Sequence, residues 1–442
     1  MPDRTIYPEP ATGIESAVDA AAAIPPPTRG SGMNLPPYVP VRPPRVKPFV
    51  ARLIMSPPQR LLAIVRLLWP IPHAFGWAAV LRYDDVAEVL QRHDVFRVPF
   101  GNEIARLNDG AEPGTPFILG IDDEAAHRRQ VERVMWAFKL QDIEQIVVPR
   151  SLESAQKRLK QAGPGSFDAI PGLITAVPID ICRDYYGVVI DEEERQTFAY
   201  ATIELSAHLF GAPPIEPSAE GREDDAGAYV RAIVDRSIDR EIASPSGSET
   251  VLARLALEYK SNKREIRAIL IGMITGFVPT NTMAGGHILE MLLRKPAMLK
   301  QARQAADAGD DDLLRHCLFE ALRYMPINLG PFRICSGDHT VAPDTARAAT
   351  LRKDTKVLAM TSSAMFDSRR VMRPFRFDPR RPASNHMHFG FGMHWCVGAM
   401  IARAQITQTF KALLVARSVE RARGRRGKLA FWGLFPDHLY ID

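Results

Sequence analysis

The apolar positions predict a mainly helical chain. In 84–96, Val86, Val89 and Leu90 recur at helical spacing, which is typical of a helix with one buried face. The same pattern, bounded by Gly- and Pro-rich breakers, predicts helices at 57–69, 122–138, 141–162, 168–186, 190–210, 226–243, 248–260, 263–294, 296–307, 311–324 and 396–418.

Short apolar runs predict a smaller β component. We expect one strand at 74–81, short strands between 331 and 360, and a strand pair after the last helix. The segments 98–119 and 366–395 are expected to be loops. Because no change of composition after residue 50 marks a linker, we expect one large helical domain at 51–442 with a small β region.

Residues 1–50 differ from the rest, with proline runs at 25–27, 36–37 and 43–44. Such a segment buries little apolar surface. We therefore expect a flexible or polyproline-like leader, or an arm lying across the folded domain. The segment does not resemble a signal peptide, because its first residues include several acids and lack an apolar core.

The longest predicted helix contains a charge-free stretch, 268–286, of about the length that crosses a bilayer. Its threonines, its asparagine, Pro279 and its glycines make it a poor lipid-facing segment. We therefore expect a helix buried in a soluble core and no membrane anchor. Asn262, with Glu265 three residues later, is expected to cap this helix.

Composition and charge exclude several classes of protein. Hydrophobic residues are 46% and charged residues 24%, which excludes a disordered, collagenous or disulfide-scaffold chain. The net charge of 56 − 51 = +5 is too small by itself to indicate a nucleic-acid or membrane partner. The four cysteines form no CxxC motif, which excludes zinc ribbons and favours a reduced, cytoplasmic setting.

The candidate chemistry concentrates around Cys396. Gly390 and Gly392 precede it, and Gly398 is expected in the first turn of the last helix. Glycines permit a close backbone approach to a flat ligand. The start of a helix offers free N–H groups that lower a thiol pKa, which suits a thiolate that binds a metal.

The stretch has three other interpretations. Cys396 can be a buried structural thiol, as most free cysteines are. A dinucleotide loop fails, because Trp395 stands where G-x-G-x-x-G needs its third glycine. A zinc or copper site has plausible ligand types but leaves the glycines and phenylalanines without a role; its ligands would be His386, His388, His394 and Cys396.

The stretch Phe389 to Gly398 reads F-G-x-G-x-H-x-C-x-G and resembles the heme-binding loop of the cytochromes P-450. The resemblance continues through Ala402 and Arg403 and covers most of 74–442. It implies a mainly α cytochrome P-450 fold that holds heme b (iron protoporphyrin IX), with Cys396 as the axial thiolate to iron.

The same resemblance implies roles for further residues. His394, Arg333 and His127 match positions that contact the heme propionates, although the family often has a cation where this chain has Val131. Phe389 matches the aromatic residue that screens the sulfur. Gly398 belongs to the glycine set that borders the heme.

A second signature is Glu320-x-x-Arg323, which resembles the family's E-x-x-R motif. By itself this spacing indicates only a surface ion pair. The resemblance implies a buried triad, completed by Arg376, that locks the cysteine loop.

The central helix departs from the family, which usually carries A/G-G-x-[D/E]-T above the heme. Aligned from Thr275, the segment puts Val278 at the acid and Pro279 at the threonine, with Thr280 next. The acid and alcohol of the family help deliver protons to dioxygen. We expect Gly276, Pro279 and Thr280 to form the catalytic segment, with Thr280 as a substitute and a proline kink near Thr275.

The resemblance implies a heme-thiolate monooxygenase that inserts one oxygen atom into an apolar organic substrate, with ferredoxin and a reductase as electron donors. The missing acid leaves open a peroxide-driven peroxygenase or a hydroperoxide-rearranging enzyme, and a non-catalytic heme-binding or sensing protein is the third hypothesis. The expected pocket side chains are Phe100, Phe117, Leu119, Phe210 and Phe277.

The segment 417–428 holds six basic residues and one acid. We expect a solvated loop or a docking patch for an acidic electron-transfer protein. Nucleic-acid binding is not expected, because no aromatic residues alternate with the basic ones.

Overall fold

The computed structural model describes residues 35–41, 50, 53, 57–111, 113–259 and 262–442. One compact unit spans Leu35–Asp442. Most of the predicted leader lies outside the described residues, but its 35–41 part packs on this unit. There the Tyr38 hydroxyl donates to Glu204 at 2.6 Å, and the Tyr38 ring centroid lies 5.7 Å from that of Tyr229.

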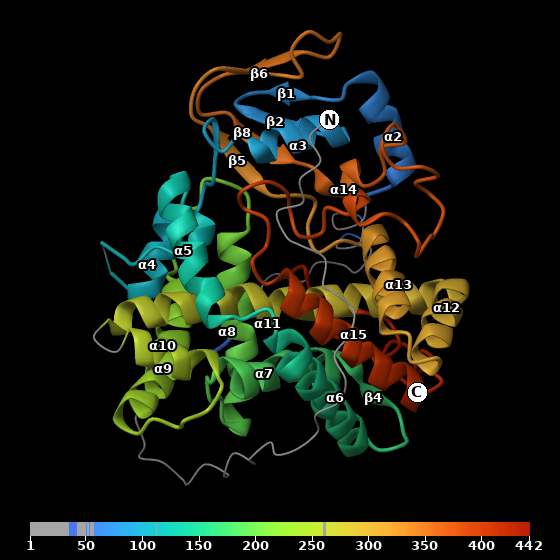
Figure 1. Cartoon of the computed structure of the whole chain (residues 1–442). Coiled ribbons are helices and arrows are strands. Elements are labelled where there is room, and N and C mark those ends of the chain that lie inside the picture. The colour runs from blue at the N-terminus through green and yellow to red at the C-terminus, as the bar shows by residue number, and fades with distance from the viewer. Residues whose placement is uncertain (1–34, 42–49, 51–52, 54–56, 112, 260–261) are drawn as a thin grey trace. The chain divides into compact units, whose positions relative to one another are not determined.

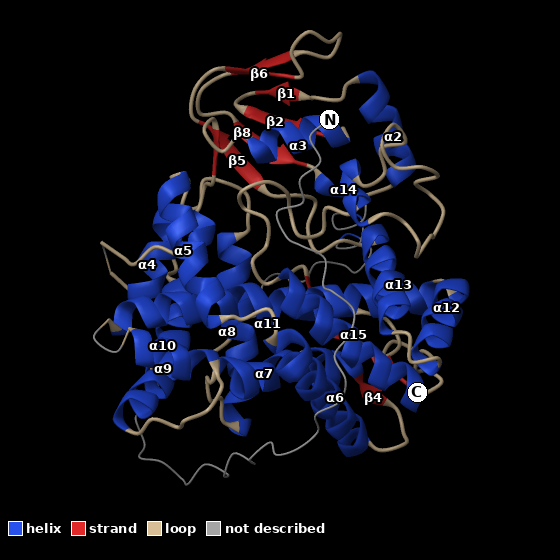
Figure 2. Cartoon of the chain, in the orientation of Figure 1, coloured by secondary structure: helices blue, strands red, loops and turns tan. Residues whose placement is uncertain are grey.

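The described unit is mainly helical (Figure 2). Its α-helices are α2 (Gln59–Leu68), α3 (Tyr83–Gln91), α4 (Gly101–Asp109), α5 (Glu124–Ala137), α6 (Val148–Ala162), α7 (Ala176–Ile181), α8 (Arg195–Leu209), α9 (Arg222–Ala243), α10 (Val251–Glu258), α11 (Lys263–Arg294), α12 (Pro296–Asp307), α13 (Asp311–Tyr324), α14 (Thr361–Ala364) and α15 (Ala399–Ala416). Short 3-10 or π segments are Ile118–Gly120, Ile143–Val147, Ile170–Ile174, Cys182–Tyr186, Glu192–Glu194 and Ala383–Asn385.

Within the described residues, the strands form one five-stranded sheet and three two-stranded sheets. In the larger sheet the order is β1-β2-β8-β5-β3, with β2 and β8 parallel and the other neighbours antiparallel. The strands are β1 (His73–Ala74), β2 (Trp77–Val80), β3 (Phe96–Arg97), β4 (Phe167–Asp168), β5 (Phe332–Cys335), β6 (His339–Val341), β7 (Ala349–Leu351), β8 (Lys356–Ala359), β9 (Ala430–Trp432), β10 (Phe435–His438) and β11 (Tyr440–Ile441).

The expectation of a mainly α fold with a small β region is confirmed, and α11, α12 and α13 have the predicted bounds. The loop predicted at 98–119 is wrong in part, because α4 lies inside it. The αL conformation of Gly110, at φ 74°, ends this helix, so the glycine that suggested a loop is its C-cap. The strand predicted at 74–81 is a hairpin, β1–β2, that turns at Gly76.

Helix α11 crosses the centre of the helical layer (Figure 1). It is long and apolar enough to cross a membrane, yet 83% of its most apolar window is buried inside the protein, as a soluble core helix requires. Asn262 caps it by accepting the amide of Glu265 at 3.2 Å. A Cβ at Gly285 or Gly286 would lie 2.6 Å from a neighbouring side chain, so these glycines permit close packing.

Candidate active site

A cavity of about 260 Å³ lies between α11 and the loop that carries Cys396. Aromatic and aliphatic side chains make up most of its wall. All five side chains predicted to line the pocket do so: Phe100, Phe117, Leu119, Phe210 and Phe277. The first three lie at the start of α4 or in the segment after it, Phe210 follows α8, and Phe277 lies on α11. The cavity is therefore suited to an apolar ligand.

The backbone of the cysteine loop is held tightly. The Cys396 amide donates to the Phe389 carbonyl at 2.9 Å, and Gly398 is the N-cap of α15. Gly390 and Gly392 have φ near +75°, at 76° and 73°. A Cβ on Gly392 would lie 2.4 Å from the Leu90 carbonyl oxygen, so the loop can pack against α3 only with glycine there.

Cys396 lies deep in the protein, and its side chain is exposed because it faces the cavity. Burial raises the pKa of its thiol, while the Gly398 amide and the charge of Arg403 act in the opposite direction. The helix start thus lowers this pKa as predicted, through the Gly398 amide, but desolvation is the larger effect and the net pKa is raised in the protein alone. A metal ion at the sulfur would reverse the balance, since a coordinated thiol is deprotonated.

Two buried basic side chains on the cavity wall lack partners for some of their nitrogens. Arg333 donates through one terminal nitrogen to the Phe332 carbonyl at 2.8 Å, but its Nε has no partner. Burial lowers its pKa to about 10. The Nδ1 of His394 also has no partner, and its Nε2 lies 3.4 Å from Asp122 Oδ1, beyond a good hydrogen bond.

His127 lies beside these groups, with its ring edge-on to that of His394 at a centroid distance of 5.1 Å. Burial and the neighbouring His394 lower its pKa to about 4, so it is a neutral imidazole at pH 7. Buried unpaired donors are costly unless a ligand satisfies them. Heme is a flat group that would supply a metal to the Cys396 sulfur and carboxylates to the unpaired nitrogens of Arg333 and His394. The residues present therefore fit heme.

One face of α11 forms the opposite wall. Gly276 and Thr280 line the cavity, and a Cβ on Gly276 would meet no atom within 4 Å. The Thr280 hydroxyl donates to the Gly276 carbonyl at 2.5 Å. Val278 and Pro279 are buried and do not line the cavity, because they fall on another face of a helix that continues through the proline.

This register corrects the sequence prediction for Pro279, which the structure does not bring to the cavity. The roles predicted for Gly276 and Thr280 stay predictions, with geometry that permits them. None of the described residues that line the cavity is an aspartate or glutamate. No other position of the described wall therefore replaces the carboxylate that Val278 lacks.

Glu320 is the centre of a buried ion cluster below the cysteine loop. Arg323 donates to both of its oxygens at 2.7 and 2.9 Å, Arg381 Nε lies 3.2 Å away, and His386 Nε2 lies 3.1 Å away. Arg376 supplies only its backbone carbonyl, to Arg381 at 2.9 Å. The prediction that Arg376 completes the triad is therefore wrong.

Arg381 lies five residues after Arg376, and the E-x-x-R motif gives no signal that distinguishes the two arginines. The zinc or copper site is also contradicted, because two of its proposed ligands bind elsewhere. His386 pairs with Glu320, and His388 faces the Phe319 carbonyl at 2.9 Å.

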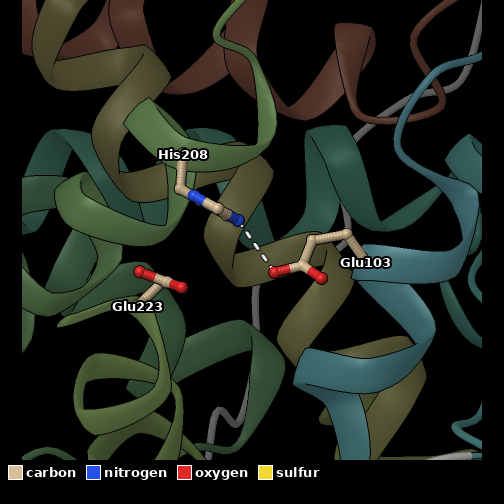
Figure 3. Close-up of side chains that lie close together, drawn as sticks. All are labelled: Glu103, His208 and Glu223. Atoms are coloured by element: carbon tan, nitrogen blue, oxygen red, sulfur yellow. Dashed lines mark hydrogen bonds and ion pairs between the residues drawn. The ribbon is translucent and has the colours of Figure 1, made fainter. Parts of the chain in front are cut away.

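A separate polar cluster ties α4, α8 and α9 (Figure 3). In it, His208 Nε2 lies 2.8 Å from Glu103 Oε1, and Glu223 faces the pair. Among the described residues this is the one group whose ligand atoms lie close enough together to hold a metal. Arg106 already donates to both Glu103 oxygens, at 2.6 and 2.8 Å, and pairs with Asp224. Glu223 accepts from the Ser218 amide and hydroxyl, both at 2.6 Å. Hydrogen bonds within the protein therefore already use these carboxylate oxygens, as in a structural cluster.

Comparison with known proteins identifies the family. The family model described as Cytochrome P450 matches residues 250–430. The chain is 27% identical over 362 residues to erythromycin C-12 hydroxylase of Saccharopolyspora erythraea, covering 79% of this chain and 86% of that one. The chain belongs to the cytochrome P450 superfamily.

Further P450 relatives agree. The chain is 25% identical to mycinamicin IV hydroxylase/epoxidase of Micromonospora griseorubida over 338 residues, or 76% of this chain and 80% of that one. The solved structure of cytochrome P450 CYP109Q5 from Chondromyces apiculatus shares the fold, with a TM-score of 0.69, 22% identity, and coverage of 89% and 96%. This P450 is thus an oxidoreductase of the monooxygenase type, with heme iron as its cofactor.

Proposed function

We propose that this P450 inserts one oxygen atom into an apolar organic substrate bound between Cys396 and α11. The observation that carries the proposal is the position of the Cys396 sulfur in a largely apolar cavity that also holds unpaired basic groups. When bound, heme b with a thiolate ligand supplies the activation of oxygen. The protein supplies the thiolate ligand and a largely apolar cavity that orients the substrate.

Each group of cavity residues has its own proposed role. Cys396 would hold the iron through its sulfur, and Gly398 borders that sulfur, since a Cβ there would lie 3.9 Å from it. Phe389, whose carbonyl accepts from the Cys396 amide, would screen the sulfur. Arg333, His394 and His127 hold the two propionates, and a guanidinium is well matched to a carboxylate. On the other wall, the Thr280 hydroxyl now donates to the Gly276 carbonyl and can instead hold a proton toward the cavity.

The proposed electron donors are a ferredoxin and its reductase, in the cytoplasm. Within the basic segment 417–428, Arg417 is engaged by the Gly163 and Gly165 carbonyls and Arg421 by Glu290. The surface left for an acidic partner therefore centres on Arg423, Arg425 and Lys428. Charge complementarity there would steer encounter and weaken as salt is added.

A second candidate is peroxide-driven turnover, which the lack of a carboxylate in the described cavity wall favours. The two are separated by supplying the purified holoenzyme with hydrogen peroxide, or with NADPH, reductase and ferredoxin. Ligands that shift the Soret band identify the substrates to use. Coupled turnover with the redox proteins alone supports the monooxygenase, and turnover with peroxide alone contradicts it.

The Thr280→Val variant tests the proton-holding role in the same assay. It should keep the ligand-induced Soret shift but lower product formed per NADPH consumed by about tenfold, since general acid contributions are of this order or larger. Unchanged coupling would remove Thr280 from the mechanism.

A further inference from the structure

Helix α2 lies beside the short helix α14 (Figure 1). It packs with a charged residue inward. Arg66 is 2% exposed, and its guanidinium donates to the Ser363 carbonyl and hydroxyl at 2.9 and 2.7 Å and to the Phe366 carbonyl at 3.0 Å. A helix on a folded domain normally buries its apolar stripe and leaves arginine in solvent. Here the order is inverted.

The apolar stripe of α2 consequently faces solvent. Leu61 is 60% exposed, Ile64 54% and Leu68 76%, at the spacing of one helical face. Trp69, which ends the helix, is also exposed. Scattered exposed leucines are ordinary, but a continuous stripe marks a surface that contacts another apolar body.

The sequence on either side of α2 carries charge of one sign. Between Ala20 and Tyr83 the sequence has no acidic residue and eight basic ones: Arg29, Arg42, Arg45, Lys47, Arg52, Arg60, Arg66 and Arg82. The whole chain has a net charge of only +5, so positive charge is concentrated in this segment. Leucine, tryptophan and basic residues together are typical of surfaces that bind anionic lipid headgroups.

We propose that the stripe formed by Leu61, Ile64, Leu68 and Trp69 binds the surface of an anionic lipid bilayer. The apolar side chains enter the headgroup region, and Arg60, which is exposed on the same helix, faces the phosphates. The contact lies on the membrane and does not span it, since α11 is buried in the protein. A symmetric contact with a second copy fits less well, because it would bring two acid-free, basic segments together.

The test is co-sedimentation of the full-length holoprotein with vesicles of phosphatidylcholine, with or without phosphatidylglycerol. Binding should require phosphatidylglycerol and weaken at high salt. The double variant Leu61→Ser/Leu68→Ser should lower the partition coefficient by at least about tenfold, because burying a single leucine already changes an equilibrium by that factor. Both side chains are exposed, so thermal unfolding should be unchanged.

Leu257→Ser is the matched control, since Leu257 is 80% exposed on α10. It should bind vesicles like the unaltered protein. Equal binding by the double variant, or no binding to either vesicle, would overturn the proposal. A concentration-dependent dimer that the double variant abolishes, without vesicle binding, would assign the stripe to a second copy instead.

Discussion

At the scale of single residues, Glu320 shows how charge holds the cysteine loop. Burial opposes its ionisation, but hydrogen bonds from His386 and Arg323 and the charge of Arg381 outweigh burial and lower its pKa to about 2. The carboxyl therefore stays ionised at pH 7 inside the protein. Breaking one partner of a buried ion pair leaves the others uncompensated.

We expect Glu320→Gln to lower the free energy of unfolding by about 3–5 kcal/mol at pH 7. Urea denaturation measures it. Glu153→Gln is the matched control, because Glu153 forms an exposed i,i+3 pair with Arg150 at 3.1 Å and should cost less than about 0.5 kcal/mol. Similar costs for both variants would contradict the role given to the Glu320 cluster.

The same carboxyl predicts a dependence of stability on pH. Its pKa in the folded protein, about 2, is below its ordinary value of 4.5, so its contribution is complete above pH 4.5 and is lost as the pH falls toward 2. Thermal unfolding of the unaltered protein should weaken across that window. The Glu320→Gln variant should show a flatter profile there, and parallel profiles would refute the assignment.

Arg333 gives a prediction of opposite sign with and without heme. In the heme-free protein its guanidinium is buried with an unpaired Nε, so Arg333→Met should leave the free energy of unfolding unchanged or raise it. In the holoprotein the variant should lose heme about tenfold faster to an acceptor protein. Arg352→Met, at an exposed arginine, serves as control. Unchanged heme loss would separate Arg333 from the propionates.

At the scale of elements, the glycines of α11 differ in how much space surrounds them. A Cβ on Gly272 would lie 2.5 Å from the Phe117 ring, whereas one on Gly276 meets open space. In a helix interior, alanine is favoured over glycine by about 1 kcal/mol. The balance between this gain and the clash should therefore differ at the two positions.

We expect Gly276→Ala to raise the free energy of unfolding by about 0.5–1 kcal/mol and Gly272→Ala to lower it by about 1–3 kcal/mol. Chemical denaturation of the heme-free proteins measures both. Equal shifts would mean that Phe117 moves aside without cost.

The same elements show what sequence reasoning can reach. The bounds of α11, α12 and α13 were predictable, because caps, breakers and apolar spacing agree there. Helix α4 was missed, since Gly110 and nearby prolines signal a loop equally well. Arg381 was missed, and Pro279 was wrongly placed at the cavity, because local sequence patterns do not show contacts between distant segments or the rotation of a helix.

At the scale of the whole molecule, the fold brings residues from far-separated segments to one cavity. His127 precedes α11 in the chain, and Arg333 and Cys396 follow it, yet all line one space. The sequence identified Cys396 because its loop motif is local. The cavity's lack of carboxylates became visible only when the described wall was assembled.

The most direct measurement is the absorption spectrum of the reduced protein under carbon monoxide. Thiolate ligation by Cys396 predicts a strongly red-shifted Soret band, which Cys396→His should replace with that of a histidine-ligated heme and Cys396→Ala should abolish. Failure of the unaltered protein to bind heme, or survival of the shifted band in Cys396→Ala, would contradict the account.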